Sequence, residues 1–362
     1  MTKLWRSTFD ENGKRQIEDI KALDISYDKP TVVFFSGFST ITKWKGFIGG
    51  ALKSTEKMLG LNKQEANKIQ IITGSYKGLS QFFNLLAYNR FPNNYCSSAG
   101  KKAARDIILP RVAQNIVLKK NNHFKSAEKL PLDEAKERLR NLTLVGYSMG
   151  TVITQEMYNA SKQFMRKIGY TKEETQELLS EVVLLSMGTM SRPTKEKNRF
   201  KTIFMVASND DVVRKRAHIH LRVKEHLARQ AKKFLKITPW SNTGLYISAP
   251  VKPRLIETII DENGQEQQKH IPMLYPKWTG FNSHHELPHY ITNNDEDNDF
   301  SKIVSVTLAN AINRNEDTTV TDLVTSTQSF VETNNNGFAS DEIESYNNRI
   351  AKAFTNKQAI KL

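Results

Sequence analysis

Short apolar runs alternate along the chain with longer segments of helical spacing. The runs are rich in β-branched and aromatic residues and predict five buried strands, at 31–35, 69–73, 142–145, 182–185 and 202–207. Between them, apolar residues recur every three or four positions, which predicts helices over 99–117 and 151–168. Continuous apolar strands that alternate with amphipathic helices are typical of an α/β fold with a mostly parallel central sheet flanked by helices.

The second half of the chain is less regular. Residues 214–236 hold nine Lys or Arg and one acid, Glu225, and predict a basic helix. The runs 255–259 and 267–271 flank a turn and predict a hairpin, and a further helix is expected at 303–312.

The polarity of the chain suggests its division into domains. We expect one domain over 1–315, with segments 39–140 and 237–280 inserted as pocket walls or a lid, and a polar, partly helical extension over 316–362.

Composition narrows the class of protein. The chain has 362 residues, 38% of them hydrophobic, and 53 Lys and Arg against 38 Asp and Glu give a net charge of +15. The single Cys96 excludes an intrachain disulfide and a cysteine-based zinc site. No apolar run approaches the ~18 residues of a membrane span and no signal-peptide pattern is present. We therefore expect a soluble protein, cytoplasmic or exported without a cleaved signal peptide.

The sharpest motif is Gly146-Tyr147-Ser148-Met149-Gly150, between a predicted strand and a predicted helix. A serine becomes a useful nucleophile when a tight strand-to-helix turn presents its hydroxyl beside a base. The flanking glycines Gly146 and Gly150 relieve crowding in that turn, and the helix amino end directs its amides at the reacting centre. This pattern favours Ser148 as a nucleophile.

Three segments together resemble the α/β-hydrolase superfamily. They are VVFFSGFS as a strand with an oxyanion loop, LTLVGYSMGTVI as the strand, nucleophile elbow and helix, and TIFMVASNDDVV as the strand before the acid. The resemblance covers roughly residues 30–312 and implies an α/β-hydrolase fold and a Ser-Asp-His triad in that chain order.

The resemblance also indicates the acid and the base. The superfamily pattern after the acid strand favours Asp210 over Asp211. A His-x-acid-hydrophobic pattern favours His284 as the base, with His285 second and His289 third. The acid would orient the imidazole and stabilise its protonated form.

Two backbone amides are expected to bind the oxyanion. One is the N–H of Met149, which follows the nucleophile, and the other is the N–H of Phe38, in the loop after the first strand. The same histidines, with Glu286 and Asp210 or Asp211, have ligand chemistry suited to zinc or manganese. No helical His-x-x-x-His frame is present, so we expect neither a metal nor another cofactor.

The sequence thus predicts a serine hydrolase of carboxylic esters, lipase- or esterase-like, whose substrates include (phospho)lipid. The basic segment 214–236 is a candidate contact for an anionic membrane surface. Two alternatives stay open. One is a catalytically silent hydrolase-fold interaction protein, and the other is a basic nucleic-acid-binding protein, supported by charge alone.

Overall fold

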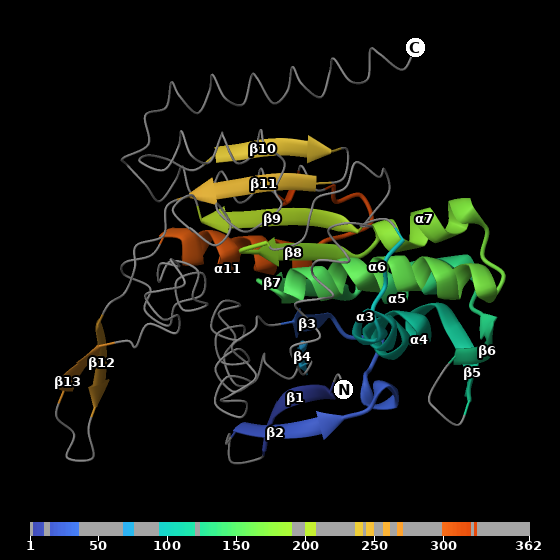
Figure 1. Ribbon diagram of the computed structural model, residues 1–362, viewed down its shortest axis with the longest axis horizontal. Helices are drawn as coiled ribbons and strands as arrows, with labels where there is room; N and C mark the ends of the chain where they lie inside the picture. The colour runs from blue at the N-terminus through green and yellow to red at the C-terminus, as the bar shows by residue number, and fades with distance from the viewer. Residues whose placement is uncertain are drawn as a thin grey trace, which may run out of the picture.

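The protein is described from a computed structural model. It describes residues 3–10, 15–35, 68–75, 94–119, 124–189, 200–207, 236–241, 244–249, 256–260, 266–270, 299–319 and 322–323. Within these ranges the chain forms a mixed α/β structure around one large sheet (Figure 1).

The large sheet has nine strands in the order β10-β11-β9-β8-β7-β3-β4-β1-β2. The strands are β1 Lys3–Phe9, β2 Arg15–Ile20, β3 Thr31–Phe35, β4 Gln70–Ser75, β7 Leu142–Tyr147, β8 Val183–Met187, β9 Lys201–Ala207, β10 Lys236–Ser241 and β11 Gly244–Ala249. The central pairings from β11 to β4 are parallel, whereas β1, β2 and β10 pair antiparallel at the two sides. All five strands expected from the apolar runs are confirmed, and they are neighbours in the parallel part.

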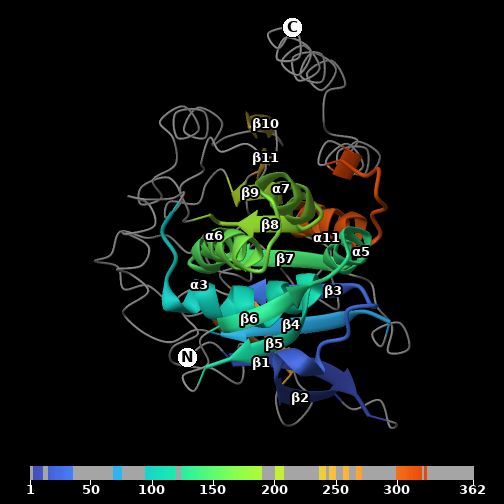
Figure 2. The same cartoon turned by 90° about the vertical axis from the view of Figure 1, so that its right-hand side faces the viewer.

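Strand register divides the buried side chains between two faces. Val33 lies opposite Ile72 and Leu144, and all three belong to the core cluster that includes Val152 and Met157 of helix α6, Gly150–Lys167. The intervening side chains, such as Phe34 and Val145, point to the other face. Helix α11, Asp299–Ile312, covers that second face (Figure 2). A parallel sheet covered on both faces explains the continuous apolar runs.

One helix prediction was partly wrong. Residues 98–112 are helical, as α3 Ser98–Ala103, a π-helical turn Ala104–Ile108 and α4 Leu109–Val112, but β5 Ala113–Leu118 then pairs with β6 Phe124–Lys129. Ile116 keeps the helical spacing, which extended the predicted helix too far. The adjacent β-branched residues Ile116 and Val117 favour a strand, and Asn115 tolerates its φ of +50°.

Other elements complete the helical layers. Helix α5 spans Leu132–Arg140, helix α7 spans Lys172–Ser180, and a short 3₁₀ turn covers Ala22–Asp24. The helix expected at 151–168 corresponds to α6 and the one at 303–312 to α11, so both predictions are confirmed. The predicted hairpin is also confirmed, as β12 Ile256–Ile260 paired antiparallel with β13 Glu266–His270.

Four of the nine strands described in the large sheet were not predicted from the sequence. The first 29 residues contribute β1 and β2, whose polar composition hides their pairing. The strands β10 and β11 come from the region around 237–280, whereas β4, which the run at 69–73 did predict, comes from segment 39–140. Each segment therefore contributes at least one strand to the large sheet, and each also forms a separate two-stranded sheet, β5–β6 in the first and β12–β13 in the second. The role of these segments as pocket walls or a lid stays a prediction.

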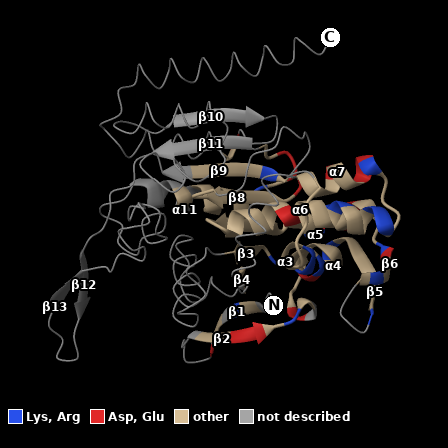
Figure 3. Cartoon of the chain, viewed as in Figure 1, with Lys and Arg blue, Asp and Glu red and all other residues tan. Residues whose placement is uncertain are grey.

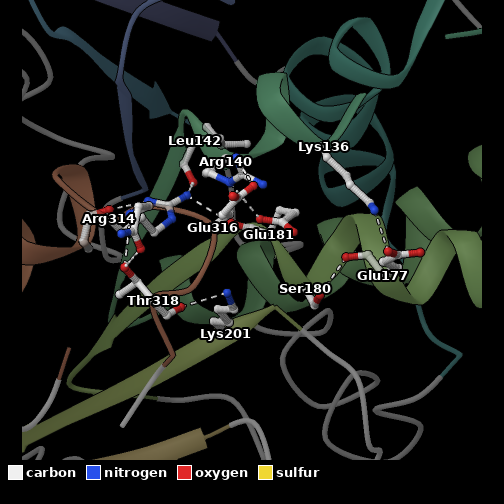
Figure 4. Close-up of polar contacts among 12 residues, drawn as sticks. Lys136, Arg140, Leu142, Glu177, Ser180, Glu181, Lys201, Arg314, Glu316 and Thr318 are labelled. Carbon is white, nitrogen blue, oxygen red and sulfur yellow. Dashed lines mark hydrogen bonds and ion pairs between the residues drawn. The ribbon is translucent and has the colours of Figure 1, made fainter. Parts of the chain in front are cut away.

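A buried arginine fastens α11 to the amino ends of β7 and β8. Arg314 donates from Nη1 to Thr143 Oγ1 at 2.9 Å, and from Nη2 to Leu142 O at 2.8 Å and Glu181 O at 3.0 Å (Figure 4). Burial lowers the pKa of Arg314 to about 9. Beside it Arg140 pairs with the Glu181 carboxylate at 3.2 Å, and Lys201 Nζ donates to Thr318 O at 3.0 Å. We call Arg140, Glu181, Lys201 and Arg314 the amino-edge clasp.

Candidate functional site

Ser148 lies in the tight turn between β7 and α6, at the carboxyl edge of the parallel sheet. Its φ is +52°, a left-handed conformation that is uncommon outside glycine and costs about 1–3 kcal/mol. The Ser148 N–H donates to Met187 O at 3.0 Å, which extends the β7–β8 pairing into the turn. The neighbouring strand therefore holds the backbone of Ser148 in this strained conformation.

The start of α6 fixes the other side of the turn. The Ser148 carbonyl accepts from the Thr151 N–H at 3.0 Å and from Thr151 Oγ1 at 2.6 Å. Ser148 is 5% exposed and sits where the first amides of an 18-residue helix point out of the helix. These amides and the helix dipole favour negative charge beside Ser148.

Gly146 allows α6 to cross close over β7. A Cβ placed on Gly146 would lie 3.0 Å from Thr151 Cα, 3.0 Å from Thr154 Oγ1 and 3.1 Å from Gly150 O. Two of these atoms belong to backbone, which yields less easily than the end of a side chain. The steric reason expected for the first glycine of the motif therefore holds in the structure. Gly150 is the first residue of α6 and is buried.

Of the two candidate donors to the oxyanion, Met149 lies within the described residues. It is the residue before the first turn of α6, so the helix itself supplies no acceptor for its N–H. The second candidate donor, Phe38, lies outside the described residues, three positions after β3 ends at Phe35.

The acid and base candidates also lie outside the described residues. These are Asp210, Asp211, His284, His285 and His289. Their places relative to Ser148 stay predictions.

The described residues that come closest in sequence to these candidates lie at one edge of the sheet. β9 is parallel to β7 with only β8 between them, so Ala207 and Ser148 lie at the same carboxyl edge. Helix α11 runs the opposite way, because Arg314, just past its end, contacts Leu142 at the start of β7. Asp299, at the other end of α11, therefore lies toward the edge that carries Ser148 (Figure 1).

Three further sequence expectations concern a metal site, a membrane span and the basic segment 214–236. Among the described residues, no group of three His, Cys, Asp or Glu side chains lies close enough to hold a metal ion. No helix in the described ranges is both long and apolar enough to cross a membrane. The basic segment 214–236 lies outside the described residues except for Lys236, which begins β10.

Comparisons with known proteins give distant likenesses. No family model and no curated protein matches the chain. A solved thermostable esterase aligns with a TM-score of 0.32 and 14% identity over 68% of this chain and 54% of the esterase, so the chain spans about half of that length. The esterase domain of a Rhodothermus marinus protein aligns with a TM-score of 0.25 and 12% identity over 68% of this chain and 87% of the domain. A functional assignment therefore has to rest on the geometry around Ser148.

Sequence reasoning missed a buried acid on α6. Ser97 caps α3 by accepting the Gly100 N–H at 3.1 Å, and its hydroxyl donates to Glu156 Oε2. Burial raises the pKa of Glu156 to about 8, and its Oε1 has no hydrogen-bond partner within the described part of the chain. Glu156 stands four positions after Val152 on the apolar side of the helix, a spacing that could have indicated its burial.

Cys96 is a poor candidate for a second nucleophile. Its Sγ donates to Glu156 O at 3.4 Å, and burial raises the pKa of the thiol to about 12. A cysteine attacks as the thiolate, which this environment disfavours. Ser148 is therefore the described nucleophile candidate with a geometry suited to catalysis.

Proposed function

We propose that the chain is a serine hydrolase that cleaves carboxylic esters through an acyl-serine intermediate. The observation that carries the proposal is Ser148, held at a φ of +52° between a buried parallel strand and the amino end of α6. A turn of this kind presents a serine hydroxyl at the edge of the sheet, where loops from other strands approach it. The geometry thus supports the α/β-hydrolase resemblance seen in the sequence.

Chain topology supports Asp210 as the acid. Asp210 follows the end of β9 by three residues, and β9 ends at the edge that carries Ser148. Three residues reach at most ~11 Å, and two strand spacings separate β9 from β7 by about 10 Å. A base between them is within reach of both. Asp211 remains the alternative.

The direction of α11 supports a base from the cluster His284, His285 and His289. These histidines precede Asp299, and that end of α11 lies toward the Ser148 edge. His284 is the preferred base, followed by His285 and His289. An imidazole is required because the hydroxyl of serine is a weak nucleophile until a base takes its proton.

The proposed reaction follows from these roles. The base takes the proton of Ser148 Oγ as the oxygen attacks the ester carbonyl, and the N–H groups of Met149 and Phe38 bind the oxyanion. The protonated base gives its proton to the departing alcohol, which leaves an acyl-serine. Water, activated by the same base, then releases the carboxylic acid and regenerates Ser148.

The proposed substrates are esters with apolar acyl chains, including those of (phospho)lipids. The excess of positive charge in the chain favours substrates that carry or lie beside anionic groups. Lipase-like or esterase-like preference is a matter of acyl length, which a series of esters measures.

Hydrolysis kinetics test the proposal. Initial rates on p-nitrophenyl esters from acetate to palmitate are compared among wild type, Ser148→Ala, Asp210→Asn, His284→Ala and His285→Ala. We expect Ser148→Ala to lower kcat by about 10⁴-fold or more and one histidine variant to match it. Full activity in Ser148→Ala, or no activity in a folded wild type on any ester, contradicts the proposal.

A matched control separates chemistry from folding. Ser186 on β8 is fully buried and pairs in register with Gly146, so Ser186→Ala removes a neighbouring serine hydroxyl that has no proposed role. We expect Ser186→Ala to retain wild-type kcat within about threefold.

A further inference from the structure

The β5–β6 hairpin exposes two adjacent apolar side chains. Val117 is 46% and Leu118 is 40% exposed, and among the described residues only Ile17 is another exposed large apolar side chain. Neighbouring residues of a regular strand point to opposite sides. The β5–β6 register shifts on both sides of Val117, and this irregularity leaves both side chains in solvent.

The hairpin is firmly anchored, so the exposure of this pair is a built feature. The Tyr170 hydroxyl lies 2.8 Å from Val112 O and 2.9 Å from Leu130 O, the residues that flank the hairpin. Phe124 packs edge-on against Phe164 of α6, with ring centroids 5.4 Å apart. The two strands are thus held at their base and against the carboxyl end of α6.

Exposed cationic side chains lie on the same hairpin and at the adjoining end of α6. Lys167 of α6 places its Nζ 4.9 Å from the centre of the Phe124 ring and donates to Phe124 O at 3.4 Å. Exposed cationic residues of the hairpin and the end of α6 are Lys119, Lys125, Lys129, Arg166 and Lys167. Figure 3 shows Lys and Arg at the end of α6 and along the hairpin.

The nearby acids balance this charge only in part. Glu128 accepts a hydrogen bond from Asn115 at 2.8 Å, and Glu174 pairs with Lys129 at 3.6 Å. The hairpin surface, which we define as Val117, Leu118, Lys119 and Lys125, therefore combines apolar contact with net positive charge.

We propose that the hairpin surface docks the protein on an anionic membrane. Two apolar side chains offer far less area than the ~800 Å² per partner of a stable protein–protein interface. They suit shallow insertion at the headgroup boundary, where surrounding lysines attract anionic headgroups.

This docking surface is separate from the ester site. The hairpin lies at the carboxyl end of α6 and Ser148 at its amino end, and 18 helical residues span about 27 Å (Figure 1). The proposal therefore concerns where the protein is held, and it stands whether or not Ser148 is catalytic.

Vesicle co-sedimentation tests the proposal. The full chain is mixed with vesicles of phosphatidylcholine alone or of phosphatidylcholine with phosphatidylglycerol. We expect binding to the anionic vesicles that weakens with added salt, because exposed charges are screened. The variants Val117→Ser with Leu118→Ser, and Lys119→Glu with Lys125→Glu, should each weaken binding about tenfold or more.

Two matched variants control for apolar and charge changes elsewhere. Ile17→Ser removes an apolar side chain of similar exposure on β2, and Lys68→Glu reverses an exposed lysine before β4. Both should bind like wild type. All variants should keep the wild-type circular dichroism spectrum and thermal midpoint.

Four outcomes overturn the proposal. If the wild type binds no anionic vesicles, or binds neutral vesicles equally well, docking on an anionic membrane is contradicted. Unchanged binding in both hairpin variants would show that another segment, for example 214–236, makes the membrane contact. Retention on polyglutamate beads without vesicle binding indicates an acidic protein partner instead.

Discussion

The two edges of the parallel sheet are built from opposite kinds of contact. At the amino edge, the Arg314 side chain satisfies backbone carbonyls from the starts of β7 and β8 and the end of α11. At the carboxyl edge, Ser148 is held in a strained backbone conformation beside helix amides that have no partner within the helix ladder. The amino edge is built for stability, whereas the carboxyl edge carries the turn at which we propose that the reaction takes place.

Substitutions at the two edges should therefore change different properties of the protein. A change in the amino-edge clasp should alter the free energy of unfolding and leave the rate per folded molecule intact. A change at Ser148 should do the reverse, since strain at functional sites is maintained by the surrounding structure. The free energy of unfolding and the hydrolysis rate per folded molecule together distinguish these two kinds of change.

Arg314→Met should give the largest loss of stability. Removing the guanidinium leaves Leu142 O, Glu181 O and Thr143 Oγ1 without this donor, and each buried polar group left unpaired costs about 1–3 kcal/mol. We expect the free energy of unfolding in urea to fall by about 3 kcal/mol or more. The ester hydrolysis rate per folded molecule should stay within about threefold of wild type.

Arg166→Met is the matched control for that substitution. Arg166 is exposed near the end of α6, so its replacement should cost no more than about 0.5 kcal/mol. Equal losses of stability in the two variants would contradict a specific stabilising role of the amino-edge clasp.

The buried Glu156 predicts that the free energy of unfolding depends on pH. Its pKa is raised from 4.5 to about 8, so above pH 4.5 the unfolded chain releases a proton that the folded protein keeps. Stability should therefore fall by roughly 1 kcal/mol per pH unit between about pH 5 and 8, and level off above that range. Glu156→Gln should flatten this slope, as measured by urea unfolding at several pH values.

Glu174→Gln gives a control of opposite sign. Glu174 completes a capping box with Thr171, and this hydrogen bond lowers its pKa below 4.5. Its contribution is present above pH 4.5 and is lost as the pH falls further, so the substitution should leave the slope between pH 6 and 8 unchanged. A wild-type stability that stays level over that range would show that Glu156 is ionised in the folded protein.

Gly146→Ala should have a smaller effect on stability than Arg314→Met, and it should also slow ester hydrolysis. The added Cβ lies 3.0 Å from Thr151 Cα, so the start of α6 must move away from β7. We expect a loss of about 1–2 kcal/mol and a fall in kcat of about tenfold or more, because Ser148 moves with the turn.

Gly169→Ala controls for the loss of a glycine. Gly169 has a φ of +99° and nothing within 4 Å of an added Cβ, so its replacement costs backbone strain of about 1 kcal/mol without crowding. It lies past the far end of α6 and should leave kcat unchanged. Equal changes in kcat for the two variants would contradict the steric account of the turn.

The sequence predicted those parts of the fold that local patterns determine. The five parallel strands are recognisable because each is a continuous apolar run, which burial on both faces requires. The turn at Ser148 is recognisable because strand, serine, flanking glycines and helix are adjacent in the chain. The strands β1 and β2 were missed because their alternation with charged residues resembles a polar loop.

Contacts between distant segments could not be predicted. Arg314 is one of many basic residues in the sequence, and only packing of α11 against β7 brings it to Leu142 O. The choice among His284, His285 and His289 likewise depends on how a distant segment meets the Ser148 edge. Ser97 and Glu156 are far apart in sequence, so their hydrogen bond emerges only when α3 packs on α6.

The role of Ser148 as nucleophile is tested most directly by the mass of the intact protein after exposure to a fluorophosphonate, followed by peptide mapping. We expect one adduct, located on Ser148, formed equally by wild type and Ser186→Ala and absent from Ser148→Ala. An adduct on another residue, or labelling that persists in Ser148→Ala, would contradict the assignment of the carboxyl edge as the reaction site.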